Sequence, residues 1–168
     1  MAAAERAGSP ARIVESRLAP EPFPVVPTPS RVTSVRIHIV HNKILVPVVL
    51  NEHQTATFLL DTGANITVIT PALARRLGVE GLPGEPKTKA RMASGQDVEV
   101  SLSRLKSIGV GSARVDNFAV AVYDLPVLVP GATPPIAVDG LLGADFVGRF
   151  TMTVEPRAGK LTLQEDAN

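Results

Sequence analysis

The sequence predicts an all-β fold, mostly strands with one or two short helices. Short runs rich in Val, Ile and Leu recur along the chain, and turns that contain Gly, Asn or Pro separate them. Only one segment carries both a start signal and a stop signal for a helix. This combination is typical of a β-barrel or a β-sandwich.

Composition limits the kinds of protein that this chain can be. Its 168 residues suffice for one domain, and 45% are hydrophobic but only 4% aromatic, so we expect an aliphatic core. The sequence has no cysteine, which excludes disulfides, thiolate metal sites and a cysteine nucleophile. A formal net charge of +1 gives no reason to expect nucleic acid as a partner. No apolar run approaches the roughly 18 residues that span a bilayer, so we expect no membrane span, and the compartment stays open.

The chain begins with a segment that has little to bury. Residues 1–31 are rich in Ala, Arg and Pro, and they contain no apolar stretch typical of a secretory signal. Closely spaced prolines favour an extended conformation. We therefore predict a flexible N-terminal arm over residues 1–31 and a folded domain over residues 32–168. Whether the arm is a pro-segment stays open.

The folded domain is expected to begin with strands. Aliphatic and β-branched residues predict strands over 32–39 and 44–50, joined by a turn at 41–43. A second turn over 51–54 leads into a third strand over 55–60.

The one clear helix follows a short strand at 67–69. Thr70 is suited to cap a helix, and Pro71 suits the first helical position. Residues 72–77 are good helix formers, and Gly78 supplies the left-handed residue on which many helices end.

The second half of the domain predicts a β-meander. Its strands are separated by turns that contain Gly, and a Pro-rich loop over 126–135 interrupts them. Residues 143–147 predict one or two helical turns, with Asp145 as an acid in the first turn. The expected strands are 89–92, 97–102, 105–110, 115–122, 136–142, 150–154 and 161–163.

The most informative stretch is the acid turn, Asp61-Thr62-Gly63-Ala64, which follows the apolar end of the strand over 55–60. A single carboxylate on a turn does not hydrolyse a peptide. Two carboxyl groups about 3 Å apart cannot both ionise, so one stays protonated as an acid while the other acts as a base on a water between them. The acid turn is therefore a candidate for one half of a catalytic pair.

These residues resemble the retropepsin-like aspartic proteases, including their bacterial members. Residues 58–69, with the acid turn at their centre, are similar to the family's hydrophobic–Asp–Thr–Gly–Ala block. Residues 139–146 are similar to the apolar–apolar–Gly element that precedes the family's C-terminal helix. The resemblance covers roughly residues 32–163, and it implies a closed barrel that hydrolyses peptide bonds.

The resemblance also implies roles for individual residues. Asp61 would carry catalysis, and Thr62 would hydrogen-bond across to a second acid turn. Gly63 and Ala64 would face the substrate. The hairpin tip lies where the family has its flap, the hairpin that closes over the substrate. The expected flap residues are Ala93, Ser94, Gly95 and Gln96.

The acid turn occurs only once, because the sequence contains no second Asp-Thr-Gly and no Asp-Ser-Gly. We therefore predict a homodimer in which Asp61 of each protomer meets the other across a two-fold axis. The resemblance implies that terminal strands of the two protomers interleave, with residues 151–154 and 161–163 as candidates. The expected partner is a polypeptide substrate.

No cofactor and no metal are expected. His38, His41 and His53 have no carboxylate at ligand spacing. The alternative to a protease is a non-catalytic module of the same fold, which binds peptides or assembles as a dimer. The intact acid turn favours the protease.

Overall fold

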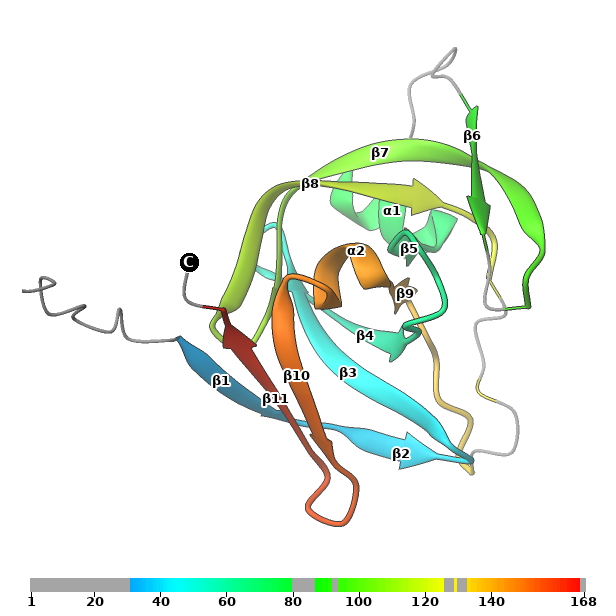
Figure 1. Cartoon of the computed structure of the whole chain (residues 1–168). Coiled ribbons are helices and arrows are strands. Elements are labelled where there is room, and N and C mark those ends of the chain that lie inside the picture. Colours follow the sequence, from blue (N-terminus) through cyan, green and yellow to red (C-terminus); the bar gives the residue numbers. More distant parts are fainter. Residues whose placement is uncertain (1–30, 80–86, 92–93, 126–128, 130–132, 167–168) are drawn as a thin grey trace, which may run out of the picture.

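Two sheets and two short helices form the part of the chain that the structure describes (Figure 1). This computed structural model describes residues 31–79, 87–91, 94–125, 129 and 133–166. The helices are α1 (Pro71–Leu77) and α2 (Ala144–Val147). The strands are β1 (Val32–Arg36), β2 (His38–Val40), β3 (Lys43–Leu50), β4 (Gln54–Leu60), β5 (Val68–Ile69), β6 (Lys87–Arg91), β7 (Asp97–Val110), β8 (Ala113–Val122), β9 (Gly140–Leu142), β10 (Phe150–Glu155) and β11 (Lys160–Glu165).

The larger sheet closes into a barrel. Its eight strands are hydrogen-bonded in the order β2-β3-β4-β9-β5-β8-β7-β6. β3 also pairs with β7, where Val49 lies opposite Gly109 and Leu50 lies opposite Ile108. The closed ring therefore consists of β3, β4, β9, β5, β8 and β7 in that order. β2 pairs with β3 and β6 pairs with β7 outside the ring. The prediction of a mostly β fold with a closed barrel is confirmed.

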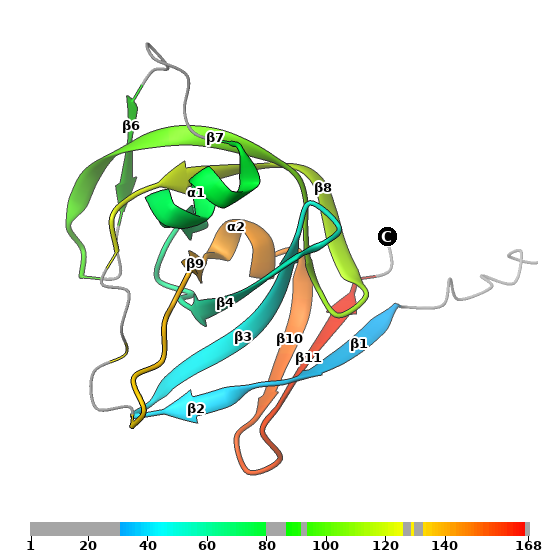
Figure 2. The same cartoon turned by 180° about the vertical axis from the view of Figure 1, so that it is seen from behind.

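The second sheet joins the two ends of the described chain. β11 lies between β1 and β10 and is antiparallel to both. Leu161 and Leu163 on β11 are buried in the main core. Thr33 on β1 accepts a hydrogen bond at its Oγ1 from the N–H of Ser112, at 3.0 Å, in the turn between β7 and β8. Figure 2 shows this three-stranded sheet at one end of the barrel, with β1 and β10 as its outer strands.

The core is aliphatic, as the composition predicts, with a small aromatic group around α2. Phe146 on α2 is fully buried, and its ring centroid lies 6.1 Å from that of Phe118 and 5.2 Å from that of Phe150. Burial of one such ring contributes roughly 1.5–3 kcal/mol to folding. This packing fixes the start of α2, which matters because β9 and α2 lie behind the acid turn.

Helix α1 forms where the sequence predicts it. The side chain of Thr70 accepts a hydrogen bond at Oγ1 from the N–H of Leu73 at 3.2 Å, and Pro71 occupies the first turn. The helix ends at Gly78, whose φ of 64° lies in the left-handed region.

Several predicted boundaries are wrong. The strands expected over 97–102 and 105–110 are one continuous strand, β7, because Ser103 and Arg104 keep their pairing with β8 while the Arg104 side chain is exposed. The strand expected over 136–142 is confined to the three residues of β9. Lys43 begins β3, and the turn before it consists of two residues at positive φ, His41 and Asn42.

Parts of other predictions lie outside the described residues. This applies to Met92 at the expected end of one strand, to most of the Pro-rich loop over 126–135, and to the N-terminal arm except for Arg31. The carbonyl of Arg31 accepts a hydrogen bond from the N–H of Glu165 at 2.9 Å, so the described chain starts beside the end of β11.

Candidate active site

Asp61 lies at the end of the parallel strand pair β4–β9. The pair sets Phe58 opposite Gly140 and Leu60 opposite Leu142. The hydrogen-bonding pattern continues one residue further, because the N–H of Asp61 donates to the carbonyl oxygen of Leu142 at 3.0 Å. The main chain of Asp61 is thus fixed by β9, while its half-buried side chain leaves the sheet.

The acid turn closes on its own carboxylate. The N–H of Gly63 donates to Oδ1 of Asp61 at 3.1 Å, and the N–H of Ala64 donates to the Asp61 carbonyl oxygen at 3.1 Å. Two main-chain donors thus hold Asp61 in one orientation. Thr62 and Gly63 are exposed in the single protomer.

Ala64 differs from its two neighbours in the turn. It is 1% exposed, and its carbonyl oxygen accepts a hydrogen bond from the N–H of Ala144 at 2.8 Å. The main chain of Ala64 is therefore engaged within the protomer on both its N–H and its C=O. Of the turn residues after the acid, Thr62 and Gly63 are the ones that present surface.

A buried polar group supports the turn from behind. Thr67 is fully buried, and Asp145 accepts hydrogen bonds from its hydroxyl at 2.7 Å and from its N–H at 3.0 Å. The Thr67 hydroxyl oxygen in turn accepts the N–H of Gly143 at 3.1 Å. Asp145 is in the first turn of α2, as predicted, and both oxygens of its carboxylate bind Thr67.

Sequence reasoning missed the role of Thr67. Two signals were available: Thr67 is a polar residue directly before a short apolar strand, and Asp145 is an acid two residues after Gly143. Neither feature identifies its partner, because the two residues are far apart in the chain.

Close backbone contact explains the glycine at position 143. A Cβ placed there would lie 2.7 Å from the carbonyl carbon and oxygen of Ile66 and 3.0 Å from the carbonyl oxygen of Ala64. Any side chain would push α2 away from the acid turn. Gly143 thus allows the backbone before α2 to contact the backbone of Ala64 and Ile66.

The β6–β7 hairpin reaches the acid turn through Asn65, the residue that follows the turn. Its side-chain Oδ1 accepts a hydrogen bond from the N–H of Arg91 at the end of β6, at 3.2 Å. The Arg91 guanidinium pairs with Asp97 at the start of β7 at 3.1 Å, and this hydrogen bond raises the pKa of Arg91 above its ordinary value. The hairpin is therefore tied both to itself and to the acid turn.

The tip of this hairpin is the predicted flap. Ser94, Gly95 and Gln96 are exposed, and Gly95 has a φ of 80° that suits glycine. Ala93, the fourth predicted flap residue, lies outside the described residues. The structure thus brings the base of the hairpin to Asn65, and the described part of its tip is open to solvent.

A small apolar cluster links the hairpin to the strands behind the acid turn. Half-buried side chains that border it include Ile66, Val98 and Tyr123. The buried members are Val68, Ala90, Val100, Ala121, Leu125 and Leu141. The hairpin and the strands behind the acid turn therefore share one apolar cluster.

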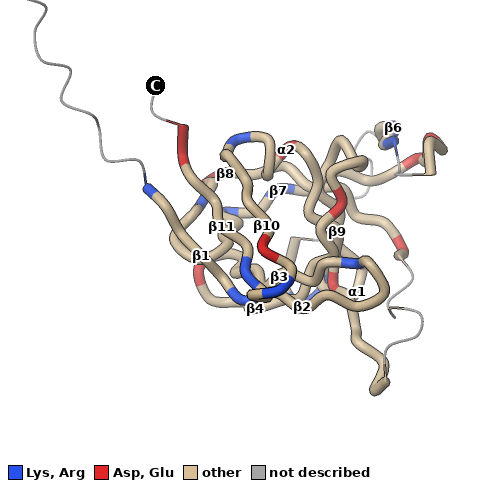
Figure 3. Tube along the Cα trace, turned by 60° about the horizontal axis from the view of Figure 1, so that its bottom comes forward, with Lys and Arg blue, Asp and Glu red and all other residues tan. Residues whose placement is uncertain are grey.

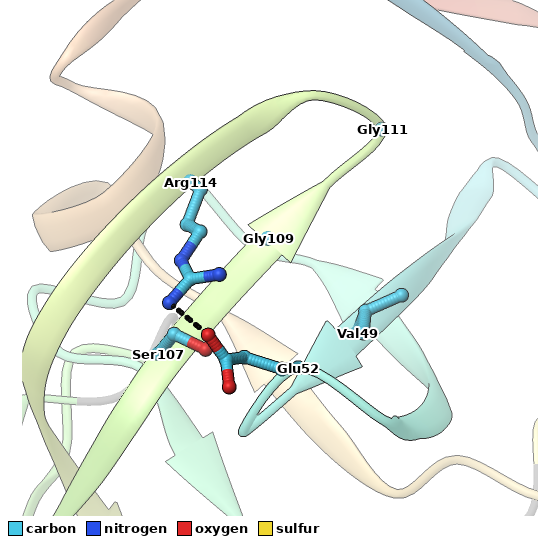
Figure 4. Close-up of a pocket in the computed structure, with 6 residues that line it drawn as sticks. All are labelled: Val49, Glu52, Ser107, Gly109, Gly111 and Arg114. Atoms are coloured by element: carbon cyan, nitrogen blue, oxygen red, sulfur yellow. Dashed lines mark hydrogen bonds and ion pairs between the residues drawn. The ribbon is translucent and has the colours of Figure 1, made fainter.

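A separate cavity of about 180 Å³ lies at the turn between β7 and β8. Figure 4 shows six residues that line it. An ion pair of 2.7 Å between Arg114 and Glu52 crosses it, and Asp116 binds the same guanidinium at 2.6 Å. These two hydrogen bonds raise the pKa of Arg114. No residue of the acid turn lines the cavity, so it is not the candidate active site.

Charge and metal ligands add no second candidate among the described residues. Basic and acidic residues lie at many places along the described chain, in short runs of either sign (Figure 3). Within the described ranges, His, Asp and Glu form no group of three or more that could hold a metal ion. In the same residues, no helix has the length and apolar character needed to cross a membrane.

Comparison with known proteins agrees with this geometry. A family model described as aspartyl protease matches residues 46–146, more than half of the chain. A retropepsin-like aspartic protease from Rickettsia conorii has a similar fold, with 20% sequence identity and a TM-score of 0.58, over 82% of this chain and 95% of that one. A search of curated proteins found no match.

Two further solved structures show weaker similarity. The EIAV protease in complex with an inhibitor is 22% identical with a TM-score of 0.47, over 66% of this chain and 90% of that one. The retroviral protease-like domain of Ddi1 from Leishmania major is 18% identical with a TM-score of 0.43, over 71% and 86%. The range matched by the family model, residues 46–146, contains both the acid turn and Gly143 behind it. The fold is the closed barrel described above. The chain therefore belongs to the aspartyl protease family and has the retropepsin-like fold.

Proposed function

We propose that the protein is an aspartic endopeptidase that works as a homodimer, with Asp61 of each protomer forming the catalytic pair. The observation that carries this proposal is the setting of Asp61. Its main chain is fixed by β9 and its carboxylate by the N–H of Gly63, while the neighbouring surface of the turn is exposed. One protomer supplies a single acid turn, so the second acid comes from a second copy.

The reaction follows from two carboxyl groups that share one proton. The ionised carboxylate takes a proton from the water between them as the water oxygen attacks the peptide carbonyl carbon. The protonated carboxyl group then donates its proton to the leaving nitrogen as the C–N bond breaks. One proton is taken up and one is released, so the pair is ready for another cycle and no cofactor is needed.

The exposed residues of the turn fit a two-fold arrangement. In an isologous contact, the same surface of each protomer meets itself. Thr62 and Gly63 are exposed in the single protomer, and a second copy placed across the axis would cover them. The Thr62 hydroxyl would then hydrogen-bond to the partner's turn and hold the two carboxyl groups at a fixed separation.

The three-stranded sheet is the proposed main interface. The candidate residues 151–154 lie on β10, an outer strand of that sheet. The candidate residues 161–163 lie on β11, which pairs with β1 on one edge and with β10 on the other, so they offer no open edge to a partner. Val32 on the other outer strand is 55% exposed. Pairing of terminal strands between protomers would cover these edges, which folded proteins rarely leave open.

The test is the substitution Asp61→Asn, which keeps the shape of the side chain and removes its acid–base function. Cleavage of an unfolded protein substrate should fall at least 100-fold, because general acid–base catalysis contributes roughly 10²- to 10⁴-fold. The matched control is Asp116→Asn, which changes an exposed acid that pairs with Arg114 at 2.6 Å, away from the acid turn, and should leave the rate unchanged.

Folding and dimerisation of both variants should be checked by circular dichroism and sedimentation. Cleavage that persists in Asp61→Asn would show that the activity resides elsewhere. Peptide binding without cleavage by the wild-type protein would instead support the non-catalytic module.

A further inference from the structure

β6 presents an open edge toward the acid turn. It is the last strand of the eight-stranded sheet, with β7 on one side only. The N–H of Arg91 does not face β7, because it donates to Asn65. Successive residues of a strand face opposite edges, so the N–H and C=O groups of Lys87 and Lys89 lie on the same edge as those of Arg91. Neither residue has a main-chain partner on that edge among the described residues.

An extended peptide recognises such an edge by adding a strand to it. The added strand would lie about 4.8 Å from β6 and would place a carbonyl oxygen opposite the Arg91 N–H. In the peptide-free protein, that position is taken by Oδ1 of Asn65, 3.2 Å from the Arg91 nitrogen. The Asn65 side chain thus stands where a peptide carbonyl would be.

We propose that Asn65 competes with the substrate: its side-chain oxygen occupies the main-chain donor of Arg91, and a bound peptide must displace it. The inference rests on the proposed function, since it assumes that a peptide binds between β6 and the acid turn. It assigns Asn65 as a residue that sets affinity for peptides, through an interaction that exists only in the free protein.

The position of Asn65 in the chain supports this assignment. It directly follows the acid turn, whose main chain is fixed by β9 and α2, so its own main chain has little freedom to move. The side chain is exposed, and the contact with Arg91 is the one hydrogen bond that it makes within the described residues. Displacement by a peptide would therefore cost a single neutral hydrogen bond and would leave the catalytic turn undisturbed.

The proposal predicts an order of affinities that a simple substrate contact would not give. Asn65→Ala removes the competing oxygen, so peptide binding should become roughly two- to tenfold tighter, the effect of one neutral hydrogen bond. Asn65→Asp keeps an acceptor and gives it a charge, which strengthens its bond to the Arg91 N–H. Binding by this variant should be weaker than that of the wild type.

The experiment measures binding without cleavage. The probe is an extended apolar peptide in which a hydroxyethylene group replaces the cleaved amide, and its Kd is obtained by calorimetry for the wild type and both variants. The control is Gln54→Ala, which removes a half-buried amide at the start of β4 whose one side-chain hydrogen bond among the described residues goes to the carbonyl oxygen of its neighbour Thr55, and it should leave the Kd unchanged. A Kd for Asn65→Ala that equals or exceeds that of the wild type would overturn the proposal.

Amide hydrogen exchange gives a second readout that needs no peptide. The Arg91 N–H should exchange slowly in the wild type and faster in Asn65→Ala. Equal rates in the two proteins would mean that Asn65 does not occupy this donor, which also overturns the proposal. Failure of every form to bind the probe would count against the proposed function as well, whereas a reversed order of affinities would count against this inference alone.

Discussion

Both oxygens of the Asp145 carboxylate bind one residue, Thr67. Oδ1 accepts the hydroxyl proton at 2.7 Å, and Oδ2 accepts the main-chain N–H at 3.0 Å. The contact joins the loop that follows the acid turn to the first turn of α2. Because Ala144 beside it also donates to Ala64, the position of Asp61 depends on a polar contact buried behind it.

The first prediction concerns this contact. Thr67→Val keeps the shape of the side chain but removes its hydroxyl, so Asp145 loses a donor and the N–H of Gly143 loses its acceptor. The free energy of unfolding should fall by about 1.5–3 kcal/mol, the value of a hydrogen bond to a charged group. Urea denaturation measures it. Thr67→Ser retains the hydroxyl and should lose much less; equal losses in the two variants would mean that the methyl group contributes as much stability as the hydroxyl and its hydrogen bonds.

The second prediction separates two reasons for a glycine. A Cβ at Gly140 would lie 2.8 Å from a ring carbon of Phe58 and still closer to the carbonyl oxygen of Val68. Gly140→Ala should therefore destabilise the protein by about 3 kcal/mol, as overpacking of a core does. At Gly78 no atom would lie within 4 Å, and the left-handed φ of 64° is the only obstacle.

Gly78→Ala is thus the matched control, with an expected loss of roughly 1 kcal/mol. Thermal and urea unfolding of the two variants should rank them in this order. An equal loss in both would show that the close contact at Gly140 relaxes until it costs no more than the left-handed φ at Gly78.

The third prediction concerns Asp139, which binds two different groups. Its Oδ2 accepts the N–H of Thr57 on β4 at 3.0 Å, and its Oδ1 pairs with Arg76 on α1 at 2.7 Å. The Arg76 side chain is 49% exposed, so Arg76→Ala should cost less than about 1 kcal/mol. Asp139→Ala should cost about 2 kcal/mol, because a part-buried N–H also loses its charged acceptor. Chemical denaturation measures both free energies of unfolding. A larger loss for Arg76→Ala than for Asp139→Ala would contradict the prediction.

Local signals predicted the local features of this fold. The capping residue Thr70, Pro71 and Gly78 define α1 through contacts within a few residues, and the sequence therefore gives both of its ends. The acid turn is likewise recognisable because Asp61 and Gly63 hydrogen-bond to each other. Such features need no knowledge of the rest of the chain.

Contacts between distant residues could not be predicted in the same way. The partner of Thr67 is 78 residues away, and nothing in either local sequence specifies the other. Ser103 and Arg104 lie between the strands expected over 97–102 and 105–110, whereas their pairing with β8 makes β7 continuous through them. The pairing of β3 with β7 that closes the barrel is equally non-local, so the residues alone left barrel and sandwich open.

The fourth prediction follows from a catalytic pair shared between protomers. If a single protomer has no activity, the activity per mole of protein should fall on dilution as dimers dissociate. Measured by sedimentation, the fraction of dimer should decline over the same range of concentration. Activity per mole that stays constant while the protein becomes monomeric would exclude the shared pair.

The fifth prediction uses mixed dimers. Asp61→Asn protomers fold and assemble in this scheme, so excess variant should draw wild-type protomers into dimers that hold only one acid. With equal amounts and free exchange, about one quarter of the dimers contain two wild-type protomers, which halves the activity of a fixed amount of wild-type protein. Addition of Asp116→Asn instead should not lower the activity, because each of its protomers still contributes an intact Asp61. Exchange of protomers should be verified with labelled protein. If protomers exchange and the activity is undiminished in both mixtures, each protomer cleaves its substrate without an acid from its partner.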